Sequence, residues 1–440
     1  MKKYLFLLFA IFAFASCKKS KLTGIEPVDL NLKVSYRTET SGYQLPLSEV
    51  KIKVTNVDTK NVLEFIANDK GTVVAPQLSP GTYDIDASIT LTAARYTTLT
   101  GIQTPNDVTF NASVKNKAIG VGYAETIELG LVTGTVSDWV IKQVYFSGSD
   151  RANGALYRDQ FIEFYNNSDK VLYADGLYFV ESTGIITIST PPKHSLLTNG
   201  QYDWSKATNM PAGIDANNDY IYVRAFLKIP GTGTQYPVQP GKSVVVAQTA
   251  INHKSPFTGV DGKTISVNDP KLTVDLSGAD FEAYYAPLLT RPLASDVDNP
   301  SVPNLEVFSY FGTDMIFDVS GRYSYALLKI TDGVDPKTFP QYAYPTLTAS
   351  STASKYIQVP AKYILDAVEV QPNEATDRIP KKYTAKLDAG FAFVPAGQYT
   401  SQSIIRKTDK TVNGRIILKD TNNSTEDFTF FDVATPRGFK

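Results

Sequence analysis

Hydrophobic and polar residues alternate along two stretches near the start of the chain. In LNLKVSY, Leu30, Leu32 and Val34 fall on one side of an extended chain and polar residues fall on the other. In VKIKVTNV, which begins at Val50, the alternation recurs with lysines between the apolar residues. Successive side chains of a strand point to opposite faces, so this period predicts strands with one buried face.

Turn residues separate these predicted strands. The sequence Asn68-Asp69-Lys70-Gly71 and the pair Pro80-Gly81 supply the chemistry of tight turns, and alternation resumes after each of them. We therefore expect a small β-sandwich over residues 27–132. Residues 18–26 are polar and short, which predicts a tether before it.

A second β-rich block is predicted over residues 133–440. In QFIEFYNNSD, Phe161, Glu163 and Tyr165 share one predicted face while Ile162 and Phe164 share the other, and a polar turn follows. We expect Glu163 to be a strand residue that fixes a neighbouring loop by hydrogen bonds. The sequence thus predicts an all-β protein of two sandwiches.

Composition agrees with this fold class and excludes some partners. The 440 residues include 26 Tyr and 23 Phe but only 3 Met, a usage that favours strands bounded by turns. Lys and Arg number 43 against 44 Asp and Glu, for a formal charge of -1. Such a balanced chain offers no overall field to nucleic acid.

The N-terminus has the pattern of an export signal. Lys2 and Lys3 precede an apolar run from Leu5 to Ala15, and Cys17, the single cysteine of the chain, follows after Ser16. This run is well short of the roughly 20 residues that a membrane-spanning helix needs. A secreted chain with one cysteine cannot form an internal disulfide, so the thiol needs another explanation.

The sequence Phe14-Ala15-Ser16-Cys17 resembles a bacterial lipobox, with Phe14 where Leu is commoner. The resemblance implies a signal peptide over residues 1–17, cleavage before Cys17, and a lipid anchor on its sulfur. Two or more acyl chains hold a protein stably on a membrane. Lys18, in place of an acidic residue, favours the outer membrane and its periplasmic face over the cell surface.

Both predicted sandwiches resemble known modules. The first is similar to prealbumin-like, carboxypeptidase-regulatory-like modules through residues 46–50, 68–71 and 78–83, which implies a spacer or docking role. The second resembles an expanded lamin-tail domain, an immunoglobulin-like sandwich. The elements that carry this resemblance are residues 161–166, 172–177, 238–247 and 363–369, Arg406, and residues 418–428.

The second block is longer than a lamin-tail core, and we assign the excess to insertions at about 181–235 and 252–360. Taken whole, the chain resembles uncharacterised lipoproteins of the Bacteroidetes, of unknown function. By analogy with such proteins, the expected partner is a TonB-dependent outer-membrane transporter or another envelope protein.

Catalytic motifs are scarce. The two histidines, His194 and His253, are 59 residues apart in loop-like contexts, and no Gly-x-Ser-x-Gly elbow occurs. The sequence PGKS at 240–243 lacks the earlier glycine of a phosphate-binding loop and is better explained as a turn before a strand. We expect no catalytic residues, no cofactor and no enzyme activity; a hydrolase that uses clustered carboxylates is the less favoured alternative.

A weak candidate for a calcium site lies in AGIDANNDYIYV. Asp215, Asn217 and Asp219 stand at alternate positions, as oxygen ligands of a Ca²⁺ loop do, but the Gly and the distal Glu of an EF-hand are missing. A solvated turn between strands explains the same residues. We expect no metal, with this loop as the one weak exception.

Aromatic residues give a second candidate for function. Sugars stack on exposed aromatic rings, and four tyrosines fall in loop-rich surroundings: Tyr284, Tyr285, Tyr342 and Tyr344. Tyrosine also serves sheet edges, which is the plainer explanation. The sequence therefore predicts a non-catalytic binding or assembly component anchored by lipid, with a glycan-binding or adhesin-like lipoprotein as the alternative.

Overall fold

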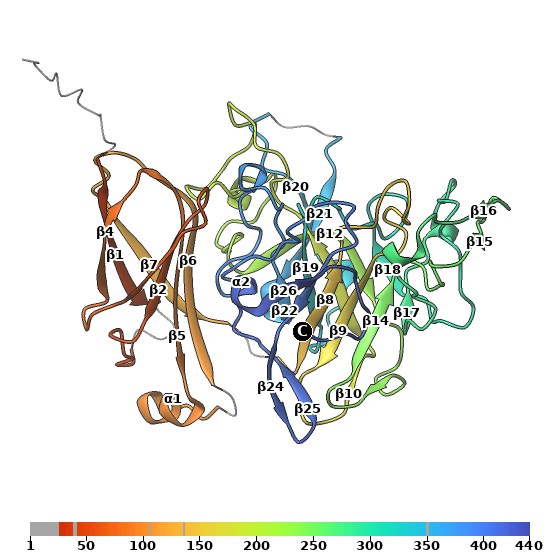
Figure 1. The fold of residues 1–440 in the computed structure, drawn as a ribbon, viewed down its shortest axis with the longest axis horizontal. Helices are drawn as coiled ribbons and strands as arrows, with labels where there is room; N and C mark the ends of the chain where they lie inside the picture. The colour runs from red at the N-terminus through yellow and green to blue at the C-terminus, as the bar shows by residue number, and fades with distance from the viewer. Residues whose placement is uncertain (1–25, 38–41, 105–106, 135–136, 349–351) are drawn as a thin grey trace, which may run out of the picture.

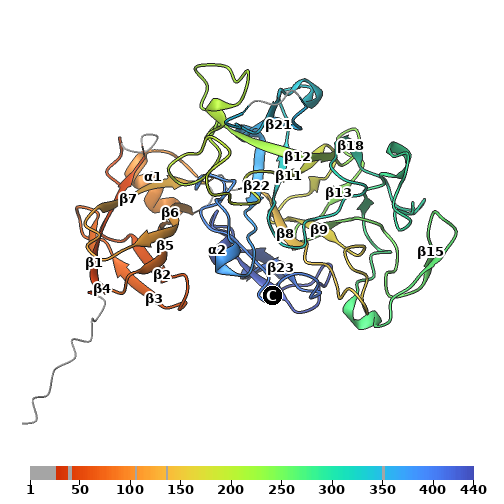
Figure 2. The same ribbon diagram turned by 90° about the horizontal axis from the view of Figure 1, so that it is seen from above.

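The computed structural model describes residues 26–37, 42–104, 107–134, 137–348 and 352–440. Two β-rich modules lie side by side, and both views show the separation between them (Figures 1 and 2). The smaller module is built from the N-terminal strands, and the larger one contains all later strands. The prediction of an all-β fold is confirmed.

The N-terminal module is one seven-stranded sheet in the order β3-β2-β5-β6-β7-β1-β4, with one helix. Its elements are β1 (Val28–Tyr36), β2 (Lys51–Asn56), β3 (Val62–Ile66), β4 (Thr72–Leu78), β5 (Gly81–Leu91), α1 (Ala93–Thr100), β6 (Val108–Ile119) and β7 (Thr126–Thr133). Strand β1 is buried at every second residue. Apolar side chains from β1, β2, β4, β5 and β7 meet in one core, as expected for a sandwich.

The predicted turn after residue 66 is present and needs its glycine. Gly71 donates its N–H to the Asn68 carbonyl over 2.8 Å, and its own carbonyl accepts the Val34 N–H at the same distance. Its φ is 73°, and a Cβ there would lie 2.3 Å from the Val34 carbonyl oxygen. Both the left-handed backbone and the close approach favour glycine.

The larger module is a sandwich of two sheets. One sheet has the order β20-β21-β12-β11-β19-β22 with β18 paired to β12, and the other has the order β17-β14-β9-β8-β23-β26. Their strands are β8 (Trp139–Tyr145), β9 (Phe161–Asn166), β11 (Leu177–Ser182), β12 (Tyr220–Lys228), β14 (Ser243–Ala247), β17 (Phe281–Glu282), β18 (Glu306–Ser309), β19 (Ser324–Lys329), β20 (Gln341–Ala343), β21 (Lys355–Pro360), β22 (Ile364–Val368), β23 (Ser403–Arg406) and β26 (Phe428–Phe431).

Short elements complete this module. Two-stranded ribbons form from β10 (Leu172–Tyr173) with β13 (Pro237–Val238), β15 (Phe257–Thr258) with β16 (Thr264–Ile265), and β24 (Thr408–Val412) with β25 (Arg415–Leu418). One helical turn, α2 (Ser424–Asp427), precedes β26. No helix in the described part of the chain is long and apolar enough to cross a membrane.

Central strands of the sandwich are buried on both faces. The main core fills the space between the sheets, and further clusters cover their outer sides. All six residues of β9 are therefore buried, although their alternation suggested two distinct faces. Glu163, on β9, accepts hydrogen bonds from Lys142 Nζ at 2.9 Å and from the Arg437 N–H at 3.0 Å. The expectation that Glu163 fixes a neighbouring segment agrees with these contacts.

The segments expected as insertions contribute strands to the sandwich. Strand β12 lies within residues 181–235 and pairs with β11 and β21, while β19 lies within 252–360 and pairs with β11 and β22. Both strands are central because their apolar faces complete the core. Only the loops around them extend beyond the sandwich.

Arg406 forms ion pairs with three aspartates in the sequence elements that resemble a lamin tail. Arg406 is 1% exposed, and its Nη2 lies 2.6 Å from Asp366 Oδ2. Its Nη1 lies 3.2 Å from Asp420 Oδ1 and 3.4 Å from Asp427 Oδ2. Burial raises the pKa of Asp427 to about 7, and the Arg406 charge opposes this rise. The buried guanidinium thus ties β22, β23 and the C-terminal segment together.

Polar contacts join the two modules. Asn111 Nδ2 donates to the Thr421 carbonyl over 2.5 Å, and Ser113 Oγ donates to the Ala389 carbonyl over 2.6 Å. Lys53 Nζ forms an ion pair with Glu426 at 2.6 Å. These contacts place β6 and β2 of the small module against the C-terminal part of the large one.

Candidate functional site

A cleft of about 870 Å³ lies between the modules. One wall is the outer face of β6 and β7, and the other is formed by residues 375–385 with part of the loop around residue 200. Ligand pockets commonly occupy about 300–1,000 Å³ and often lie between domains. We therefore take the cleft as the candidate binding site.

Two buried side chains hold in place the loop of residues 375–385, which we call the cleft loop. Glu369 Oε2 accepts the N–H groups of Lys382 (2.9 Å) and Tyr383 (3.1 Å). Gln371 Oε1 accepts the Ile379 N–H at 3.1 Å. Both acceptors directly follow β22, so the sandwich core fixes the shape of the loop. A second hollow of about 410 Å³ lies against the same loop and shares Gln371 and Ile379 with the cleft.

Arg378, in the cleft wall, is a buried arginine whose charge is incompletely paired. Its side chain is 5% exposed, and its Cζ lies 4.7 Å from the centre of the Phe391 ring and 5.1 Å from that of Phe393. The nearest carboxylate, Asp84 Oδ2 of the small module, is 4.0 Å from Nη1, and Nε has no partner among the described residues. Burial lowers the pKa of Arg378.

The lysines of the wall have partners. Lys115 Nζ lies 2.6 and 2.7 Å from the two carboxylate oxygens of Asp86. Lys381 donates to the Asp388 carbonyl, and burial lowers its pKa. Lys117 Nζ lies 5.2 Å from the centre of the Tyr123 ring. Arg378 therefore differs from Lys115 and Lys381, which have hydrogen-bond acceptors, in that its buried Nε has none among the described residues.

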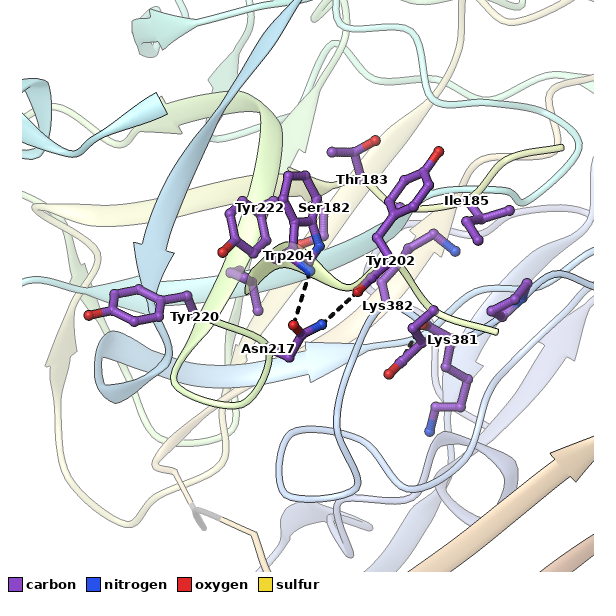
Figure 3. Close-up of a pocket in the computed structure, with 14 residues that line it drawn as sticks. Ser182, Thr183, Ile185, Tyr202, Trp204, Asn217, Tyr220, Tyr222, Lys381 and Lys382 are labelled. Atoms are coloured by element: carbon purple, nitrogen blue, oxygen red, sulfur yellow. Dashed lines mark hydrogen bonds between the residues drawn. The ribbon is translucent and has the colours of Figure 1, made fainter. Parts of the chain in front are cut away.

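A small aromatic pocket adjoins the cleft and shares Gln201 and Lys381 with it (Figure 3). Its volume of about 20 Å³ matches roughly one water molecule. The rings of Trp204 and Tyr222 stack beside it with centroids 3.5 Å apart. This cluster is a small core of its own and supports the cleft from behind.

The weak calcium candidates serve this aromatic pocket. Asn217 Oδ1 accepts the Trp204 N–H at 3.0 Å, and its Nδ2 donates to the Tyr202 carbonyl at 2.7 Å (Figure 3). Asp215 Oδ1 accepts the N–H groups of Asn217 and Asn218. The carbonyl of Asp219 accepts the Ala361 N–H. Within the described ranges, no three His, Cys, Asp or Glu residues are placed to hold a metal ion.

The four loop tyrosines are not brought together on one surface. Tyr285 is 1% exposed and belongs to the main core, while Tyr342 is 7% exposed and belongs to the aromatic core around Trp204. Tyr344 is half-buried and stacks on Tyr356 with centroids 4.4 Å apart. Tyr284 is half-buried next to Tyr285. The expectation of a tyrosine platform is corrected for Tyr285 and Tyr342, because neighbouring side chains cover their rings.

Both histidines pack as neutral rings. His253 is 2% exposed, its Nε2 lies 3.0 Å from the Thr249 carbonyl oxygen, and burial lowers its pKa to about 4. The His194 ring packs against Tyr202 and Tyr344.

Cys17, the predicted lipid attachment point, lies outside the described residues. Sequence reasoning missed Arg378, because only the contact between modules distinguishes it from any loop arginine.

The fold and the cleft define a two-module β-sandwich protein with a cleft between its modules. Residues 239–435 match a family described as "Protein of unknown function (DUF4876)". The chain is similar to a solved DUF4876 family protein from Bacteroides thetaiotaomicron VPI-5482, with 25% identity and a TM-score of 0.51. The match covers 92% of this chain and 95% of that one, so it includes both modules.

A slighter likeness is to a DUF3823 family protein from Bacteroides ovatus ATCC 8483. It has 11% identity and a TM-score of 0.14, over 50% of this chain and 99% of that one. No curated protein matches the chain.

Proposed function

We propose that this chain is a DUF4876-type lipoprotein of a Bacteroidetes cell envelope that binds a ligand or partner without catalysis. The observation that carries the binding role is the cleft of about 870 Å³, to which both modules contribute walls. A rigid cleft between two domains is a common place for a ligand to bind. The similarity to a Bacteroides protein over most of the chain supports the assignment of origin.

Anchoring is proposed from the sequence around Cys17. Cleavage before this residue and acylation of its sulfur would hold the protein on the outer membrane, with the periplasmic face favoured. A TonB-dependent transporter is the proposed partner, and the cleft or the small module would serve as the docking surface. The alternative is a glycan-binding lipoprotein, favoured by the serine, threonine and amide side chains that line the cleft.

Two measurements test this proposal. Intact mass and membrane fractionation of the wild-type protein are compared with those of Cys17→Ser; the wild type should gain the mass of acyl chains and stay with the outer membrane, whereas the variant should not. Affinity purification from detergent-solubilised envelope should then recover a defined outer-membrane protein or glycan. A wild-type protein without lipid would contradict the anchoring, and hydrolysis of a recovered ligand would contradict the non-catalytic role.

A further inference from the structure

We propose that the cleft binds an acidic polysaccharide, and that Arg378 holds a carboxylate or sulfate group of that chain. This inference rests on the proposed binding function and adds the chemical class of the ligand. It is carried by the place of Arg378 in the cleft wall, by its burial, and by the absence of an acceptor at its Nε among the described residues.

An arginine side chain has five N–H donors in a planar fork that matches a carboxylate or sulfate. Arg378 is 7% exposed and Nε has no partner among the described residues. Burying a cation without hydrogen bonds is unfavourable, and the Phe391 and Phe393 rings compensate only in part. An anion that enters the cleft would compensate this buried charge and accept hydrogen bonds from the guanidinium group.

Asp84 does not fill this role. Its Oδ2 is 4.0 Å from Nη1 of Arg378, which is too long for a hydrogen bond. Its other oxygen, Oδ1, accepts the Asn116 N–H at 2.8 Å and so holds the carboxylate on the small module. Asp84 therefore attracts the guanidinium without a hydrogen bond to it, and it competes with any anionic ligand.

The rest of the cleft wall suits a carbohydrate chain. Uncharged hydrogen-bonding side chains, including Asn116, Asn199 and Asn218, line the cleft beside apolar ones such as Ile379 and Phe391. Hydroxyl groups of sugars can exchange hydrogen bonds with amides, and the apolar faces of sugar rings can pack on aliphatic and aromatic groups. Lys117 adds a second cation on β6, whereas Asp86 already pairs with Lys115. These features favour an acidic polysaccharide over an acidic polypeptide.

Calorimetric titration of the mature lipidated protein in detergent tests the ligand class. The probes are polygalacturonate and dextran sulfate as acidic polymers, dextran as the neutral polymer, and poly-glutamate as the acidic polypeptide. We expect the acidic polysaccharides to bind with an affinity that falls as salt is raised, and dextran and poly-glutamate to bind at least tenfold more weakly. Equal binding of poly-glutamate would overturn the choice of polysaccharide.

Three variants test the role of Arg378. Arg378→Met keeps the packing on the phenylalanines and should weaken binding at least about tenfold, the effect of losing a charge-assisted hydrogen bond. Arg378→Lys keeps the charge without the planar fork and should recover only part of the affinity. Arg291→Gln removes an exposed arginine that does not line the cleft and should leave binding unchanged.

A fourth variant separates ligand binding from a purely structural role. Asp84→Asn removes the competing charge but keeps an oxygen that can accept the Asn116 N–H, so affinity for the acidic polymers should rise. A structural role for Arg378 would give no such rise. If dextran binds as well as the acidic polymers and Arg378→Met has no effect, the ligand class is wrong while the binding function stands.

Discussion

The buried ion cluster around Arg406 allows a stability prediction with a defined pH dependence. Replacement of Arg406 by Leu leaves the carboxylates of Asp366, Asp420 and Asp427 without their cation, and it also removes the donor to the Ile141 carbonyl. Removing one partner of a buried ion pair destabilises by about 3–5 kcal/mol. At about 2–4 °C per kcal/mol for a domain of 150–250 residues, the larger module should melt roughly 6–20 °C lower.

The loss of stability should grow with pH. Burial raises the pKa of Asp366, Asp420 and Asp427, whereas the Arg406 charge lowers it, so the pKa values rise further when the arginine is removed. A carboxyl whose pKa is raised on folding stabilises the fold only below that pKa, and the contribution disappears as pH rises through it. The variant should therefore lose less stability at pH 5, where its carboxyls are protonated, than at pH 8.

Urea unfolding at pH 5 and pH 8, followed by tryptophan fluorescence and circular dichroism, measures this difference. Arg437→Leu is the matched control, because Arg437 forms a half-exposed ion pair with Asp280 at 2.9 Å. An exposed pair contributes about 0–1 kcal/mol, with little dependence on pH in this range. Equal losses for Arg406→Leu at both pH values would refute the electrostatic reasoning.

Three further substitutions probe other parts of the fold, each by thermal or urea unfolding. Gly71→Ala should destabilise the small module by more than about 1 kcal/mol, since the new Cβ would meet the Val34 carbonyl oxygen in a left-handed turn; no change would mean that the turn relaxes freely. Tyr285→Ala truncates a core side chain and should lower the free energy of unfolding by about 3–5 kcal/mol. A loss of ligand binding with unchanged stability would instead favour a tyrosine platform. Asn217→Ala leaves the backbone N–H of Trp204 unpaired and should lower the free energy of unfolding by about 1–3 kcal/mol. Stabilisation of the wild type by added Ca²⁺ would contradict this structural role.

Part of the fold follows directly from local pattern. The alternation in β1 predicts a half-buried strand, and β1 is buried at every second residue because one sheet face of the small module is left to solvent. The same reasoning is incomplete for β9, where residues from the 250–302 region and from the C-terminal segments cover the outer face and all six residues are buried. Burial of a second face depends on segments distant in sequence, which alternation does not record.

The candidate site shows the same limit more strongly. Arg378 stands in a loop without a motif, and its significance depends on Asp84, which is almost 300 positions earlier in the chain and belongs to the other module. Of the four candidate tyrosines, Tyr285 and Tyr342 fill cores instead, because their rings bury large apolar areas. A binding residue of this kind can be found only after the packing of the two modules is known.

Hydrogen bonds and an ion pair connect Arg406 and the elements around it to the loop that lines the cleft. Strand β22 carries Asp366, which Arg406 binds, and the chain continues to Glu369, whose side chain holds the cleft loop. Asp388 accepts the Glu369 N–H at 2.7 Å and the Ser424 N–H at 2.8 Å, so the C-terminal segment supports the same loop. Because the Ala389 carbonyl then accepts Ser113 Oγ of the small module, these bonds also set the distance between the walls. Loosening the Arg406 cluster should therefore weaken ligand binding at Arg378 without any change in the residues that line the cleft.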